Sequence, residues 1–146
     1  MNVSSVAGFL PVPNFAVYAA SKAYVNSFTE ALRAELRSLN ISVTALCPGP
    51  VPTEFNQVAI RRAGDASPPP DFVTVPVQEV VRQALNGIAR DRPRVIPGLV
   101  VRILMTVVIF IPMFLKRLVF DLQLRRQKAP QASLRSNLGS NVPSRI

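Results

Sequence analysis

The feature that most constrains the fold is a long helical pattern that runs directly into a segment rich in β-branched residues. In Phe15–Leu39, apolar residues recur at about every third or fourth position, which is typical of an amphipathic helix. Ile41–Leu46, with the sequence ISVTAL, has the composition of a short strand. Asn40 separates the two and can end the helix in a left-handed conformation. A helix that leads so directly into a strand predicts an α/β layer with a parallel sheet.

The remaining segments continue this alternation. Asn2–Gly8 has the pattern of a strand end followed by a turn of small residues, and Val77–Arg90 has the pattern of a second amphipathic helix. Arg94–Ile96 is expected to form a further short strand. Glu54–Val75, which contains SPPP, is expected to be irregular. We therefore expect residues 1–98 to form one partial α/β domain.

The C-terminal part of the chain is first apolar and then basic. The uncharged run ILMTVVIFIPMFL lies between Arg102 and Lys116 and is too short for a membrane span, which needs about 20 apolar residues. The apolar segment reaches that length only if all of residues 99–120 are counted. Three interpretations stay open: a helix packed on the domain, insertion into a membrane surface, and a membrane span. We expect a hydrophobic and basic helical segment over 99–128 and a disordered tail over 129–146.

The formal net charge of +9 is concentrated near the C-terminus. From Lys116 onward the chain holds seven Lys or Arg residues and one acid, Asp121. A solvated basic tail and contact with an anionic membrane surface both account for this excess. Nucleic acid is not an expected partner, because the basic residues lack interleaved aromatics and any known reader motif.

The chain holds one cysteine, Cys47, and no histidine. One cysteine cannot form an internal disulfide, so we expect a reducing compartment, the cytoplasm, with membrane association left open. Cys47 itself is expected to be a small buried residue. Without histidine, Ser–His–Asp and Cys–His nucleophiles and histidine-based metal sites are excluded, and we expect no metal. Chemistry must therefore use Ser, Tyr, Lys or carboxylates.

Tyr18 and Lys22 stand four residues apart, so they lie on one helix face with their Cβ atoms about 6 Å apart. An ammonium beside a phenol favours the ionised phenolate, and such a tyrosine can act as a general acid or base. Ser5 lies thirteen residues before Tyr18, across the turn, and its hydroxyl could hold a carbonyl or alcohol oxygen. Tyr-x-x-x-Lys alone is a weak motif. Here SSxAG precedes it, and PGPVPT follows it at Pro48–Thr53.

The segments NVSSVAG, YAASKAYVNSFTEALRAEL and ALCPGPVPTEF, in this order and spacing, make the chain resemble the short-chain dehydrogenase/reductase family over about residues 2–97. The resemblance implies a Rossmann-type, doubly wound parallel sheet, NAD(H) or NADP(H) as cofactor, and a small alcohol or carbonyl compound as substrate. It implies that Tyr18 is the catalytic acid/base and that Ser5 orients the substrate oxygen. It implies that Lys22 binds the nicotinamide ribose and favours the ionised phenol.

The resemblance also implies cofactor contacts in the loop after the second strand. The Val51 backbone and the Thr53 side chain would meet the nicotinamide carboxamide, and Pro48 and Gly49 would shape the turn. The predicted cofactor-binding residues are therefore Tyr18, Lys22, Pro48, Gly49, Val51 and Thr53. In the family the helix that carries Tyr and Lys often packs against its copy, so the 15–39 helix is a candidate homo-oligomer contact. The apolar composition after Gly98 mildly favours a lipophilic substrate.

The family's glycine-rich turn, TGxxxGxG, binds the cofactor pyrophosphate at a helix N-terminus. No two of the six glycines here are close enough to form it, and the NNAG segment and the upstream catalytic asparagine are also missing. We therefore expect the first four strands to precede Met1, and this chain to be a C-terminal half that is poorly stable, or associates, and is inactive alone. The alternative is a non-catalytic remnant that binds a membrane or a partner through residues 99–128.

Overall fold

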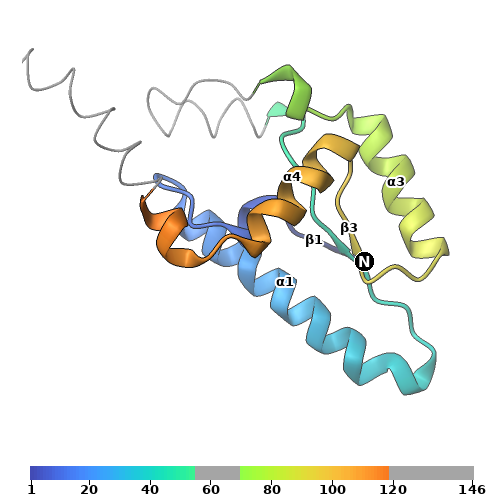
Figure 1. Ribbon diagram of the computed structural model, residues 1–146. Coiled ribbons are helices and arrows are strands. Elements are labelled where there is room, and N and C mark those ends of the chain that lie inside the picture. Colours follow the sequence, from blue (N-terminus) through green and yellow to red (C-terminus); the bar gives the residue numbers. More distant parts are fainter. Residues whose placement is uncertain (55–69, 119–146) are drawn as a thin grey trace, which may run out of the picture. The chain divides into compact units, whose positions relative to one another are not determined.

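The computed structural model describes residues 1–54 and 70–118, and a parallel sheet of three short strands lies at the centre of this part (Figure 1). The strands are β1 (Asn2–Val3), β2 (Ala45–Leu46) and β3 (Arg94–Val95), and they lie side by side in the order β1-β2-β3. Asn2 pairs with Ala45, and Ala45 pairs with Arg94 on its other side. Because all neighbours are parallel and helices connect them, the predicted α/β fold class is confirmed.

Helices cover both faces of this sheet. The helices are α1 (Ala16–Leu36), α3 (Val77–Ala89) and α4 (Leu99–Phe110), with short 3₁₀ segments at Val6–Phe9, Arg37–Leu39 and Asp71–Val73 and further helical residues at 113–118. Successive strand residues point to opposite faces. The Arg94 side chain pairs with Glu30 of α1, whereas Val95 packs against Gly87 of α3. Figure 1 accordingly shows α1 and α3 on opposite sides of the strands.

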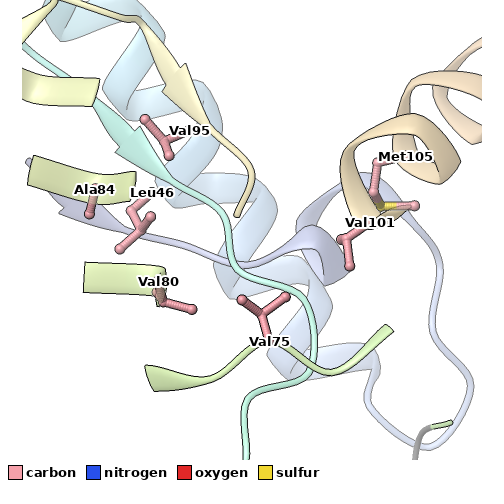
Figure 2. Close-up of a cluster of buried hydrophobic side chains, with 7 residues drawn as sticks. All are labelled: Leu46, Val75, Val80, Ala84, Val95, Val101 and Met105. Atoms are coloured by element: carbon pink, nitrogen blue, oxygen red, sulfur yellow. The ribbon is translucent and has the colours of Figure 1, made fainter. Parts of the chain in front are cut away.

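The core lies between the sheet, α3 and α4. Its buried members are Leu46, Val75, Val80, Ala84, Val95, Val101 and Met105 (Figure 2). Val101 and Met105 stand four residues apart on α4 and are each only 4% exposed. The first turns of the apolar C-terminal segment therefore pack on the domain, and contacts group residues 1–109 into one unit.

Several element lengths differ from the sequence prediction. Asn40 is left-handed, with φ 55°, as expected, but the predicted strand Ile41–Leu46 is regular only at Ala45–Leu46. The predicted apolar helix is interrupted, because α4 ends at Phe110 and helix resumes at residue 113. Pro112 explains the break, since proline has no N–H and its ring clashes with the preceding helical turn.

Within residues 1–54 and 70–118, no helix combines the length and the apolar character needed to cross a membrane. The predicted tail at 129–146, the end of the predicted 99–128 segment, and most of the predicted irregular segment at 54–75 lie outside the described residues.

Candidate functional site

The candidate site forms where β1 and β2 end. The two strands are parallel, so their carboxyl ends lie at the same edge of the sheet, where ligands bind in open α/β sheets. Backbone hydrogen bonds continue past the strands: Ser4 N donates to Leu46 O at 2.7 Å, and Val6 N donates to Pro48 O at 3.0 Å. The segment that carries Ser5 and the loop that begins at Pro48 are thereby held next to each other.

Ser5 is buried, and its hydroxyl is held by local contacts. Its Oγ accepts a hydrogen bond from Ala7 N at 3.2 Å and so caps the 3₁₀ segment that follows. The same hydroxyl donates to Pro48 O over a long 3.4 Å. Because this second bond is weak, a better acceptor, such as a substrate oxygen, can replace it.

Tyr18 and Lys22 face one another on α1, as their spacing predicts. The Lys22 Nζ lies 5.7 Å from the centroid of the Tyr18 ring, within reach of a cation–π contact. Nζ also donates to the carbonyl oxygen of Val3, at the end of β1, at 3.2 Å. An ammonium has three N–H donors, so this bond fixes the lysine at the sheet edge and leaves it further donor capacity.

Two small residues fix the position of α1 over β1. The Ser4 hydroxyl donates to the Lys22 carbonyl at 2.9 Å. A Cβ on Gly8 would lie 2.7 Å from the Lys22 carbonyl carbon, so only glycine allows this close approach. Sequence reasoning assigned no role to Ser4 or Gly8, although both belong to the SSxAG motif. Their spacing ahead of Tyr18 was the available signal.

The predicted cofactor loop follows β2 directly. Val51 packs at the border of the core, and a Cβ on Gly49 would lie 3.0 Å from a methyl carbon of Val101, so α4 closely covers this turn. The Thr53 hydroxyl donates to Val51 O at 3.5 Å, the long limit of a hydrogen bond. No hydrogen bond among the described residues joins Thr53 to Ser5 or Lys22. The structure therefore brings Ser5 and Pro48 together, and Tyr18 and Lys22 together, while Thr53 stays within its own loop.

Cys47 is fully buried between β2 and α1, as expected. Its Sγ donates to Asn26 Oδ1 at 3.2 Å. Burial raises the pKa of the thiol to about 11, and Arg94 opposes this shift only in part. Since the thiolate is the reactive form, we expect this cysteine to react slowly in the folded chain.

Two cavities are found among the described residues. One, of about 670 Å³, is lined by the end of α1, residues 40–42 and Asp91. The other, of about 220 Å³, lies between α3, β3 and α4. Ser5, Tyr18 and Lys22 line neither of these two cavities.

Comparison with known proteins matches residues 1–63 to the short chain dehydrogenase family. A sulfoacetaldehyde reductase 2 of Chromohalobacter salexigens is 46% identical over 65 residues, which cover 44% of this chain and 25% of that protein. A very-long-chain 3-oxoacyl-CoA reductase of Anas platyrhynchos is 34% identical over 88 residues, 60% of this chain and 28% of that protein. The chain thus spans about a quarter of the length of such relatives.

A solved short-chain dehydrogenase from Sphingobium yanoikuyae, in complex with NADPH, has a similar fold. It superposes with a TM-score of 0.57 at 26% identity, covering 99% of this chain and 46% of the other. The shared fold, the family match and the related sequences agree with the arrangement of parallel strands and helices described above. Residues 1–63 thus match the short chain dehydrogenase family, and the fold is similar to that of a solved short-chain dehydrogenase.

Proposed function

We propose that this chain provides the catalytic half of an NAD(P)-dependent oxidoreductase that acts on alcohols or carbonyl compounds. The observation that carries the proposal is the pairing on α1, where the Lys22 ammonium lies 5.7 Å from the Tyr18 ring. Lys22 is tied to the end of β1, and Ser5 follows that strand directly. These contacts support the proposal that Ser5, Tyr18 and Lys22 act together at the carboxyl edge of the sheet, where this kind of fold binds ligands.

Each residue has a distinct role in this proposal. In carbonyl reduction the Tyr18 phenol donates a proton to the carbonyl oxygen, and in alcohol oxidation the phenolate accepts it back. The Lys22 ammonium, which lies against the Tyr18 ring, would hold the nicotinamide ribose. The Ser5 hydroxyl donates a hydrogen bond to the same substrate oxygen, in place of its long bond to Pro48 O. This arrangement holds the oxygen between the serine and the tyrosine.

The donors at this edge suit the nicotinamide end of the cofactor. Lys22 would hold the ribose together with Tyr18, and the loop of Pro48, Gly49, Val51 and Thr53 would hold the carboxamide. A bound nicotinamide supplies or accepts the hydride. The six glycines of the chain do not form a pyrophosphate-binding turn. We therefore expect turnover only when a glycine-rich half of this fold is also present.

The substrate class is a carbonyl or alcohol, with a lipophilic compound preferred. Two relatives are named for reducing sulfoacetaldehyde and very-long-chain 3-oxoacyl-CoA, which differ greatly in polarity but share a carbonyl group. The preference comes from α4, which is apolar over most of its length and packs on Gly49 through Val101.

A non-catalytic role is the second candidate, in which residues 99–128 bind a membrane or a partner. The large exposed apolar side chains of α4 favour it. We also propose that a second copy of the chain packs on α1, where Val17, Tyr24 and Phe28 form an exposed stripe. Neither assembly requires turnover, so both can be tested apart from the enzyme activity.

The deciding experiment is Tyr18→Phe in a polypeptide that also carries a glycine-rich N-terminal half of the family. We expect carbonyl reduction to fall on the order of 10²–10⁴-fold, because the proton donor is lost while the ring is kept. Cofactor binding, measured by NADPH fluorescence, should weaken far less than turnover, because Lys22 still holds the ribose. Tyr24→Phe, on the same helix and exposed, is the matched control and should keep full activity. Undiminished turnover by Tyr18→Phe would refute the acid/base role.

A further inference from the structure

The outer face of α4 is apolar although nothing among the described residues covers it. Val101 and Met105 point into the core, and Leu99, Ile103 and Val107 stand four residues apart along the opposite side. These three side chains are 61%, 57% and 58% exposed. We call them the outer stripe of α4. Large apolar side chains that are exposed along one side of a helix favour an interaction site.

A cavity rich in arginine adjoins this stripe. The cavity of about 220 Å³ between α3, β3 and α4 is lined by Arg90, Arg92, Arg94 and Arg102, together with neutral residues. Arg94 is neutralised by Glu30 at 2.6 Å, but the other three make no ion pair within residues 1–54 and 70–118. The sequence holds no Asp or Glu from Arg92 to Phe120. This surface therefore carries net positive charge, and we call it the arginine cavity.

Arg102 connects the two features. It lines the arginine cavity and directly precedes Ile103 of the outer stripe on the same helix. A helix with apolar residues on its exposed side and basic residues beside them suits the boundary between lipid headgroups and acyl chains. Arginine in particular donates paired hydrogen bonds to phosphate. The apolar side chains would enter the acyl region while the arginines meet headgroup phosphates.

We propose that the outer stripe of α4 and the arginine cavity together form a docking surface for an anionic phospholipid membrane. The surface is independent of the proposed catalytic residues and would serve an active or an inactive chain alike. A second copy of the chain is a poorer occupant of this surface, because a two-fold contact would bring the two sets of unpaired arginines together. Since Val101 of α4 packs on Gly49, docking would place the lipid surface one helix away from the proposed cofactor loop.

The first test uses the absence of tryptophan from the chain. In Ile103→Trp, the single tryptophan should show a blue-shifted emission when vesicles of phosphatidylcholine and phosphatidylglycerol are added, and a much smaller shift with phosphatidylcholine alone. Phe72→Trp, at an exposed position of the 3₁₀ segment Asp71–Val73, is the control and should show no shift. Emission from Trp at 103 that is already blue-shifted without vesicles, or shifts with protein concentration, would mean that protein covers the stripe and would overturn the proposal.

The second test separates this surface from the basic residues beyond residue 118. In co-sedimentation of the full chain with the same anionic vesicles, Arg102→Gln should lower the partition coefficient about fivefold, as expected for one cation at an anionic surface. Ile103→Ser should lower it as well, through lost apolar burial. Arg37→Gln removes an exposed arginine that lines the other cavity and should leave binding unchanged. If Arg102→Gln and Ile103→Ser bind like the parent chain, or if neutral vesicles bind equally well, the proposal is wrong.

Discussion

Arg33 joins three parts of the chain through one guanidinium group. From α1 it donates two hydrogen bonds of 2.7 Å to the carboxylate of Asp91, in a paired geometry. It also donates to the carbonyl oxygens of Val43, just before β2, and of Asp91 itself. Hydrogen bonds from Arg33, and then from Ser42, lower the pKa of Asp91 from 3.8 to about 2. The ionised Asp91 therefore favours the folded chain.

Asp91→Asn should make this contribution visible. The left-handed φ of 48° at Asp91 is well tolerated by asparagine, so the substitution mainly removes the charge. Because the pKa of Asp91 is lower in the folded chain, its stabilisation is fully present above about pH 4 and is lost as the pH falls toward 2. In urea unfolding at neutral pH, the variant should be less stable than the parent chain, and the difference should shrink below about pH 4.

Glu35→Gln is the matched control for that titration. Glu35 is an exposed acid on α1 and makes no ion pair with the described residues. Its substitution should change the free energy of unfolding little at any pH. A difference between Asp91→Asn and the parent chain that stays constant down to pH 2 would show that the carboxylate does not stabilise the fold.

Gly87 determines how closely α3 packs on the sheet. A Cβ at this position would overlap the Cγ2 methyl of Val95 on β3. Helix propensity alone would make Gly87→Ala stabilising by about 0.5–1 kcal/mol. Overpacking in a core costs about 1–3 kcal/mol, so we expect a net loss of about 1 kcal/mol in the free energy of unfolding.

The loss from Gly87→Ala should be specific to its contact with Val95. Val95→Ala removes the methyl groups that obstruct a Cβ at residue 87. In a double-mutant cycle, Val95→Ala should therefore lower the free energy of unfolding less in the Gly87→Ala background than in the parent chain. Asn86→Ala, at the neighbouring exposed position of α3, is the control and should be neutral or slightly stabilising. Additive effects of the two core substitutions would mean that α3 shifts away from β3 at no cost.

The exposed stripe on α1 predicts self-association. Tyr24 and Phe28 stack with ring centroids 5.9 Å apart, yet they are 68% and 46% exposed. Tyr24→Glu would place charges within the buried contact between two copies, so it should shift the sedimentation coefficient toward that of a monomer. Ser38→Glu, exposed beyond the end of α1, should have no such effect. A parent chain that sediments as a monomer at all concentrations would contradict this assembly.

The sequence predicted local elements and the Tyr18–Lys22 pair well, because both depend on spacing along one helix. The lengths of the strands are predicted less well from the sequence. The regularity of a strand depends on its neighbours in the sheet and not on its own composition. The break in the helix at residues 111–112 follows from Pro112, whose effect the hydropathy of the surrounding apolar run does not report. The Arg33–Asp91 pair joins residues 58 positions apart, and no periodic pattern reports such a contact.

At the scale of the whole molecule, the described residues expose much apolar surface for the size of their core. Seven buried residues form the main cluster, while large apolar side chains on both α1 and α4 are exposed. The outer edges of β1 and β3 make no strand pairs among the described residues. Low stability, or association of the 146-residue chain by itself, therefore stays a prediction, and a partner surface or a second half of the domain would relieve it.

The 146-residue chain alone should not bind NADPH tightly. A ligand raises the melting temperature of a protein only if it binds the folded state. The sequence of this chain holds no glycine-rich turn that could bind the pyrophosphate of NADPH. We expect no saturable change in Tm on addition of NADPH, whereas a chain that also carries a glycine-rich half should be stabilised. Alkylation of the buried Cys47 checks that the sample is folded, because the thiol should react slowly at mildly alkaline pH and rapidly in urea. A saturable rise in Tm for the chain alone, in a sample with protected Cys47, would mean that the nicotinamide edge suffices for binding and that the glycine-rich turn is dispensable.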